Sequence, residues 1–229
     1  DALPAADKLT LEDAETVENL YTLYSQMADK TLVENGDVLE AAYAKIQQLR
    51  GEDTAAKLVA DIAALPAVDK LILGDEGAVS SLEYRLENLA EEYVELVTNA
   101  DLLKSARVRL TEIQSKLDAL DILLTTKLNG AITLESKGLI DEAIKAMGGL
   151  AAADITTLTS YEQYFVPAVV DYVNLLINSL FTDGELTAVS KNNVASLKDT
   201  LAQIDTYFAH IPEADHKYVT KADAVADMQ

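Results

Sequence analysis

Two histidines and two carboxylates lie close together near the C-terminal end of the sequence. His210 and His216 flank the segment that holds Glu213 and Asp215, and these residue types bind divalent metal ions in proteins. Pro212 lies between the histidines and prevents a clean i, i+4 pair of ligands on one helix. A metal site at these four residues therefore competes with a polar loop between two helices, and the loop is the favoured interpretation.

The densest aromatic group is a second place where chemistry could occur. It consists of Tyr161, Tyr164, Phe165 and Tyr172, and a glycan or a peptide could stack on such rings. Tyr161, Phe165 and Tyr172 share one helical face with other apolar residues, which favours core packing for these three. Tyr164 lies off that face, so it is the candidate ligand-binding residue.

Other patterns typical of enzymes are absent from the sequence. There is no cysteine, no glycine-rich phosphate loop, no serine-centred elbow and no His-Glu-x-x-His motif. Carboxylate pairs are frequent, but catalytic carboxylates need an apolar pocket that separates their pKa values. The loops lack the ligand order of an EF-hand, so we expect no cofactor, and weak Ca²⁺ binding in calcium-rich media at most. The sequence predicts that the protein is not an enzyme.

The composition excludes several classes of partner. The 229 residues include 18 basic and 39 acidic side chains, which gives a formal net charge of −21. Nucleic acids and anionic lipids need Lys/Arg patches, so neither is an expected partner, and charge also disfavours broad binding to an anionic wall polymer. No apolar run approaches the length that spans a bilayer, so we expect no membrane insertion. Apolar residues make up 49% of the chain, enough for a packed core.

Ten residues near the start of the sequence recur 62 positions later. Residues 2–11 and 64–73 match at eight of ten positions, and each copy is followed by a second motif, at 33–37 and at 97–101. Weaker copies of the two motifs lie at 130–134, 158–162, 184–187 and 219–223. We predict four units: 1–52 (partial), 53–116, 117–174 and 175–229 (truncated). Incomplete outer units are expected of a fragment of a longer array.

Apolar residues alternate at spacings of three and four, which predicts α-helices packed along their length. Four such series are Val17, Leu20, Tyr24, Met27; Val79, Leu82, Leu86, Leu89, Tyr93, Leu96; Ile140, Ala143, Met147, Leu150; and Val194, Leu197, Leu201, Ile204, Phe208, Ile211. They follow Thr10, Ile72, Thr133 and Thr187, and threonine is a good N-cap. Asp13 lies three residues after Thr10, as in a capping box.

A longer helix is predicted from Asn99 to about residue 128. Its apolar stripe is Leu103, Ala106, Leu110, Ile113, Leu117, Leu120 and Leu124. At about 29 residues, or roughly 44 Å, it is too long for one small unit. Similar stripes cover 39–65, with a break or bend expected at Gly51, and 161–179, with a kink at Pro167. We therefore predict an all-α fold of tandem three-helix bundles, joined by long continuous helices into an elongated rod.

The motif Ala-Leu-Pro-x-x-Asp-Lys-Leu-Thr-Leu at 2–11, followed by Val-x-Asn-x-Asp at 33–37, resembles α-helical repeats of Gram-positive S-layer and other cell-surface proteins. The close match covers 2–106, and the predicted architecture is similar to spectrin repeats. The resemblance implies a secreted, extracellular segment at the cell surface or cell wall. Its implied partners are other copies or domains of the same surface protein, with cell-wall polymer as a further one. It implies no catalytic residues.

Two functions from different classes follow. The first is a non-catalytic structural segment of a bacterial cell-surface or S-layer protein, which acts as a stiff spacer or assembly rod. The alternative is an extracellular, adhesin-like binding module that recognises a host protein or a cell-wall glycan through one helical face. Such a module needs an exposed apolar or aromatic patch. A spectrin-like intracellular scaffold is a further alternative.

Overall fold

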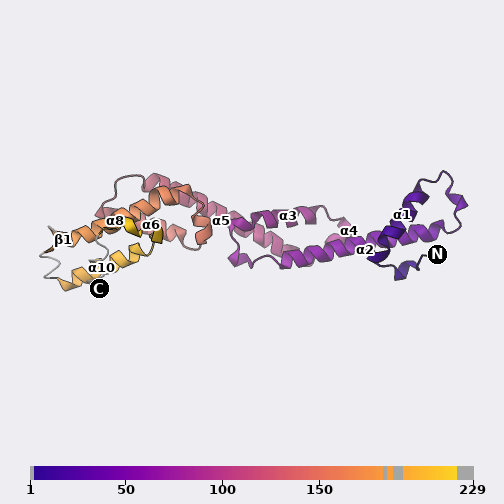
Figure 1. Cartoon of the computed structure of the whole chain (residues 1–229), viewed down its shortest axis with the longest axis horizontal. Helices are drawn as coiled ribbons and strands as arrows, with labels where there is room; N and C mark the ends of the chain where they lie inside the picture. Colours follow the sequence, from indigo (N-terminus) through magenta and orange to yellow (C-terminus); the bar gives the residue numbers. More distant parts are fainter. Residues whose placement is uncertain (1–2, 183–184, 188–192, 221–229) are drawn as a thin grey trace. The chain divides into compact units, whose positions relative to one another are not determined.

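The computed structural model describes residues 3–182, 185–187 and 193–220, and the protein is all-α, as predicted (Figure 1). Within these ranges the strands are β1 (Phe181–Thr182) and β2 (Glu185–Leu186), an antiparallel pair in which Phe181 lies opposite Leu186. The chain forms two compact units. Unit 1 is Asp1–Leu71 with Asp75–Arg109, and unit 2 is Ile72–Gly74 with Leu110–Gln229. Predicted features at positions 1, 2, 184 and 221–229 lie outside the described residues.

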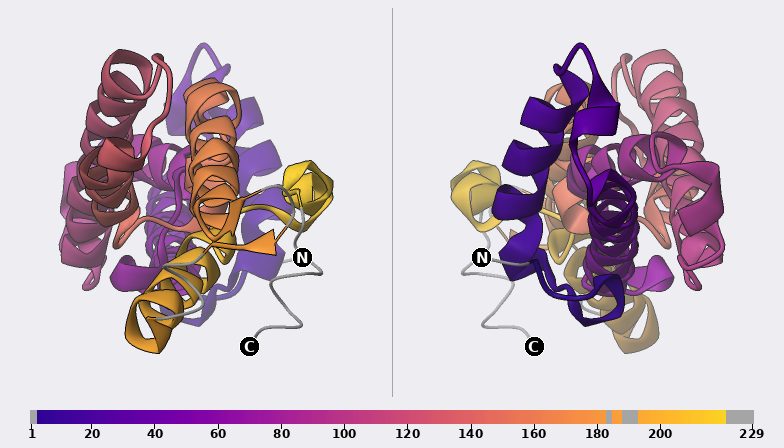
Figure 2. Two further views of the ribbon diagram at one scale, coloured as in Figure 1. Left: turned by 90° about the vertical axis from the view of Figure 1, so that its left-hand side faces the viewer. Right: turned by 90° about the vertical axis from the view of Figure 1, so that its right-hand side faces the viewer.

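The first half of unit 1 is a pair of packed helices. Its elements are η1 (Ala6–Lys8), η2 (Leu11–Asp13), α1 (Ala14–Ser25), η3 (Lys30–Leu32) and α2 (Gly36–Ala63). The predicted capping box is confirmed, because the backbone N–H of Thr10 donates to Asp13 at 2.9 Å. Figure 2 (right) shows α1, in indigo, beside the first part of α2. Their shared core is Leu9, Ala14, Val17, Ala42 and Ile46.

The second half of unit 1 repeats this order. Its elements are η4 (Val68–Lys70), α3 (Glu76–Glu87), α4 (Glu91–Val94) and the first part of α5 (Ala100–Lys127). Between η4 and α3 lies η5 (Leu73–Asp75), of which Leu73 and Gly74 belong to unit 2. The bounds of η1, η2 and α1 recur in η4, η5 and α3 at a constant offset of 62 residues. The helices α2 and α5 are 28 residues each. The repeat in the sequence is therefore a repeat of structure.

Two different sets of neighbours cover α2 inside unit 1. Its N-terminal half packs on α1, and near the middle of α2 Arg50 forms an ion pair with Glu18 of α1 at 2.6 Å. Its C-terminal half lies beside α3, where Arg85 and Asp61 form an ion pair at 2.6 Å. The side chain of Asn99 also donates to the carbonyl oxygen of Val59 at 2.9 Å. One helix thus serves both repeats.

The predicted break at Gly51 is wrong, because α2 continues through it. Gly51 is needed for space: a Cβ there would lie 2.1 Å from the ring of Tyr93. The glycine lets the α4 segment approach α2 closely, and the cost of a helical glycine, roughly 1 kcal/mol relative to alanine, is offset by that contact.

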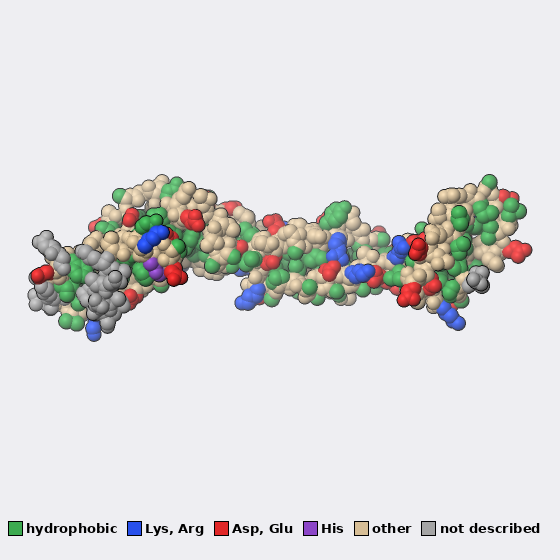
Figure 3. Space-filling view, in the orientation of Figure 1, with side chains coloured by type: hydrophobic (Ala, Val, Ile, Leu, Met, Phe, Trp, Pro, Cys, Tyr) green, Lys and Arg blue, Asp and Glu red, His purple; other side chains and the backbone are tan. Residues whose placement is uncertain are grey.

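Part of the predicted apolar stripe of α1 is exposed. Val17 and Tyr24 are buried, but Leu20 and Met27 are 41% and 39% exposed. Leu23, which the predicted series does not include, is 65% exposed. Figure 3 shows hydrophobic side chains gathered over α1 and the segment after it. Burial of this predicted series is therefore only partial.

The second apolar series does not form one helix. The helix α3 ends at Glu87, where the Asn88 side chain donates to the Tyr84 carbonyl oxygen at 2.7 Å and competes with the helical pattern. Ala90 is extended, and the four-residue α4 follows. Leu96, the last member of the series, is 47% exposed.

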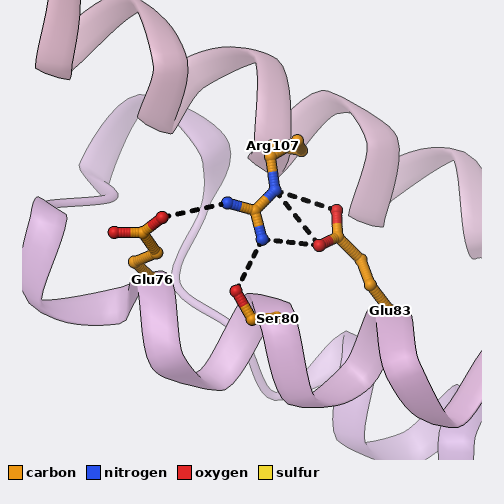
Figure 4. A network of polar contacts seen from close by, with 4 residues as sticks. All are labelled: Glu76, Ser80, Glu83 and Arg107. Carbon is orange, nitrogen blue, oxygen red and sulfur yellow. Dashed lines mark hydrogen bonds and ion pairs between the residues drawn. The ribbon is translucent and has the colours of Figure 1, made fainter.

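The same interhelical position is occupied differently in the two repeats. In the first, the rings of Tyr21 and Tyr43 stack with centroids 3.8 Å apart. In the second, Glu83 and Arg107 take the corresponding places and form a bidentate pair, with Nε–Oε1 and Nε–Oε2 distances of 3.0 and 3.1 Å (Figure 4). The Arg107 guanidinium also donates to Ser80 at 2.7 Å, and the hydrogen bonds that it donates to Glu83 raise the pKa of Arg107. This network ties α5 to α3.

The predicted long helix is confirmed. In α5, all seven residues of its apolar stripe are at most 2% exposed. The remaining elements of unit 2 are η6 (Leu134–Ser136), α6 (Lys137–Met147), α7 (Ala152–Ile155), the π-turn η7 (Tyr161–Phe165), α8 (Val166–Ser179), α10 (Val194–Phe208) and η8 (Glu213–Tyr218). In Figure 2 (left), α8 is the orange helix that faces the viewer. It supplies the largest share of the core of unit 2.

Helix ends in unit 2 follow local chemistry. Thr133 forms a capping box with Ser136, and α6 stops at Gly148-Gly149, where Gly149 has a φ of +82°. Thr187 is not the N-cap of α10. The N-cap of α10 is Asn193, whose side chain accepts from the backbone N–H of Ser196 at 3.0 Å.

We predict opposite effects for alanine at two helical glycines. Gly77→Ala adds a methyl group that meets nothing within 4 Å, so it should stabilise the protein by up to about 1 kcal/mol. Gly51→Ala should destabilise it by about 1–3 kcal/mol, since Tyr93 must move. Denaturant unfolding measures both. In a Tyr93→Ala background, Gly51→Ala should become neutral or stabilising, and a persistent loss would contradict this role for Gly51.

Candidate functional site

Unit 2 contains a groove of about 760 Å³. One side is the π-turn with the first turns of α8, and the other is the segment around η8. The lining residues are Thr156, Tyr161, Glu162, Val166, Pro167, Val170, Asp171, Asn174, Pro212, Ala214, Asp215 and Tyr218. A smaller hollow of about 400 Å³ shares Thr156, Tyr161 and Pro212 with it and reaches His210.

Pro167 explains one wall of the groove. Proline has no N–H to donate to the preceding turn, and the chain forms a π-turn immediately before α8. The irregularity predicted at Pro167 is therefore present as a widened turn. The five-residue π-turn leaves Phe165 in the core and Tyr161 half-buried at the groove.

Asn174 holds the other wall in place. Its side-chain amide donates to the Tyr218 carbonyl oxygen at 3.0 Å, and its oxygen accepts from the backbone N–H of Thr220 at 2.7 Å. These bonds join the middle of α8 to a segment 44 to 46 residues later in the chain. The Asn174 side chain thus connects the two walls of the groove.

The groove is negatively charged and aromatic. Glu162, Asp171 and Asp215 line it, and its lining residues include no Lys, Arg or His. Burial raises the pKa of the Tyr161 hydroxyl, and the charges of Asp215 and Glu162 raise it further, so it stays neutral. Beside the groove, the Lys217 Nζ lies 4.9 Å from the centroid of the Tyr218 ring, a cation–π contact.

The candidate metal residues do not form a metal site among the described residues, where no group of three or more His, Asp or Glu is placed to hold an ion. His216 is engaged elsewhere: its Nε2 lies 3.0 Å from the Ile211 carbonyl oxygen, and its ring lies against Phe208. His210 lines the smaller hollow and Asp215 the groove, while Glu213 is exposed.

Tyr164, the candidate ligand-binding residue, is half-buried and packs against the core of unit 2. It is not among the residues that line either hollow. Tyr161 lines both, although its helical face suggested a core position. Sequence reasoning missed Asp171, and the available signal was a single charge within the apolar run 166–177.

A second polar cluster in unit 2 joins α6 to α10. Lys137 pairs with Asp141 at 2.6 Å, and the buried Tyr207 hydroxyl donates to the same carboxylate at 2.5 Å. The Tyr207 ring packs edge-on against Tyr172 of α8, with centroids 5.0 Å apart. A lysine, a carboxylate and a tyrosine could exchange protons, but all three here are used to hold three helices together.

Comparison with models of known protein families, with curated proteins and with solved structures found no match. None of the described helices has both the length and the apolar character that crossing a membrane requires. The assignment of function therefore depends on the geometry of the chain itself.

We predict that the Asp141 cluster makes stability depend on pH. Burial tends to raise the pKa of Asp141, but hydrogen bonds from Lys137 and Tyr207 outweigh it and hold the pKa below its ordinary value. The stabilisation is therefore complete above the unfolded-state pKa, near 4, and is lost as the pH falls through the lower folded-state pKa.

Urea unfolding at several pH values between 6 and 3 tests this. The stability difference between the wild type and Asp141→Asn should shrink as the pH falls below about 4. Asp199→Asn, an exposed carboxylate change on α10, is the control and should show a smaller difference throughout. A difference for Asp141→Asn that does not vary with pH would rule out this linkage.

Proposed function

We propose that the chain is a non-catalytic structural segment of a bacterial cell-surface or S-layer protein, a stiff spacer built from tandem three-helix bundles that share helices. The observation that carries this proposal is α2, a single helix covered by different neighbours along its two halves within unit 1. The helix α5 has the same length and the corresponding place in the repeat, and its buried stripe is unbroken.

A shared helix favours stiffness for a simple reason. Bending a bundle junction that lies within a helix requires backbone hydrogen bonds to break, whereas a loop junction bends freely. The net charge of −21 also discourages such segments from collapsing on one another. The extracellular location and the partners, other copies or domains of the same surface protein, belong to this proposal through the resemblance of the repeat motif.

Small-angle X-ray scattering tests the stiff spacer. A compact globule of 229 residues would have a radius of gyration of about 17 Å, and we expect a clearly larger value. Ser115→Pro, at an exposed position within α5, should change the scattering profile by breaking the helix, whereas Ser115→Ala should leave it unchanged. A wild-type value near 17 Å would overturn the proposal.

The groove in unit 2 favours a second candidate, a binding module. Three carboxylates and two tyrosine rings suit a cationic peptide segment of a partner protein, and the contact of Lys217 with Tyr218 is an example of such recognition inside the chain. The same charge disfavours anionic wall polymer as the occupant.

A lysine-rich peptide titrated against the full chain, followed by NMR, tests the second candidate. The double variant Glu162→Gln/Asp215→Asn should weaken binding about tenfold, because it removes two groove charges. Asp118→Asn/Asp199→Asn removes the same charge from exposed helical positions and should have little effect. Equal weakening by both would mean general charge attraction and no groove site.

A further inference from the structure

One exposed residue of α1, Leu20, has buried counterparts elsewhere in the chain. At the constant offset of the repeat, Leu20 corresponds to Leu82, and the matching position in the third repeat is Ala143. Leu82 is 6% exposed and Ala143 is completely buried, but Leu20 is 41% exposed. The same place in the repeat is therefore covered in two cases and uncovered in one.

The second repeat contains the element that covers this place. There α3 packs against two helices, the first part of α5 and the C-terminal half of α2. In the first repeat α1 packs against α2, which corresponds to α5, and no described helix corresponds to the other neighbour. The uncovered side of α1 carries Leu20 and Leu23, spaced to lie on one helical face, and the exposed Met27 follows just after the helix ends.

We infer that this face of α1 binds an amphipathic helix of the type that the C-terminal half of α2 provides. Such a helix has apolar residues at the register of Ala55, Leu58 and Ile62, which are at most 2% exposed in α2. The inference deepens the proposed structural role by naming the element through which a neighbouring repeat joins. The inference depends only on the repeat of the helices along the chain, and it does not require the protein to be elongated.

The sequence of the partner helix is constrained further. In the second repeat Arg85 reaches across to Asp61 of α2, but the residue at the corresponding position of α1 is Leu23. An aspartate opposite a leucine would lose its partner and be partly desolvated. The helix that binds α1 therefore has an apolar residue where α2 has Asp61.

An extended chain tests the inference. A copy of residues 36–62, in which the residue copied from Asp61 is changed to Leu, is fused directly before Asp1. In this register Ala2-Leu3-Pro4 follows the added helix in the same way that Ala64-Leu65-Pro66 follows α2. The chain has no cysteine, so Leu23→Cys is a single reporter of this face. The extension should slow its alkylation at least about tenfold, whereas Thr22→Cys, an exposed residue on the opposite side of α1, should react unchanged.

Two matched extensions make the result specific. One keeps the aspartate at the Asp61 position and should protect the Leu23→Cys thiol less. The other replaces the copies of Ala55, Leu58 and Ile62 with glutamine and should not protect it. Equal protection by the glutamine extension, or no protection by the apolar one, would overturn the inference.

The unextended chain provides the remaining outcome. If its Leu23→Cys thiol became protected as protein concentration rose, with a dimer seen by sedimentation, the face would belong to a second copy of the chain and the inferred helix would be wrong. We expect a monomer whose reactivity does not depend on concentration. This result is independent of the scattering experiment, so the two proposals can fail separately.

Discussion

The structure depends on helices whose apolar stripe continues for more turns than any one neighbour can cover. A 28-residue helix is about 42 Å long, whereas the 12-residue α1 and α3 are about 18 Å each. Burying the whole stripe of α2 therefore requires two successive neighbours. That requirement couples one repeat to the next, because leaving half the stripe exposed would cost the hydrophobic stabilisation of several residues.

Contacts at the flanks of this core vary, but its centre does not. Val17 and Val79 occupy matching positions and are both completely buried. Ala42 and Ala106 also occupy matching positions and are at most 2% exposed. Beside them, a stacked tyrosine pair in one repeat is replaced by the Glu83–Arg107 ion pair in the other. Small buried residues keep the helices at a similar separation, and at the half-exposed edge either kind of pair fills the space.

Unit 2 departs from this pattern where the candidate groove lies. The π-turn before Pro167 and the hydrogen bonds of Asn174 lie at the two walls of this groove. The first feature is an irregular turn of the backbone, and the second is a set of hydrogen bonds between distant parts of the chain. The groove combines three carboxylates with two tyrosine rings, the features on which the proposed binding of a cationic segment depends.

Local features of the chain were readable from the sequence, because they depend on residues a few positions apart. The capping box of Thr10 and Asp13, the end of α6 at Gly148-Gly149 and the full length of α5 are of this kind. The predicted break at Gly51 failed, since the reason for that glycine is the ring of Tyr93, 42 positions away in the chain. Tyr161 and Asp215 were both singled out in the sequence, but their meeting in one groove with Asp171 was missed for the same reason.

Leu20 and Leu82 separate what each level of structure decides. They are the same residue type at the same place in a repeat, and the sequence alone determined that both lie on the apolar face of a helix. Only the tertiary structure decided that one is 41% exposed and the other 6%. The periodicity of a helix specifies which way a side chain points, but its burial depends on whether another helix lies opposite, and that helix comes from a distant part of the chain.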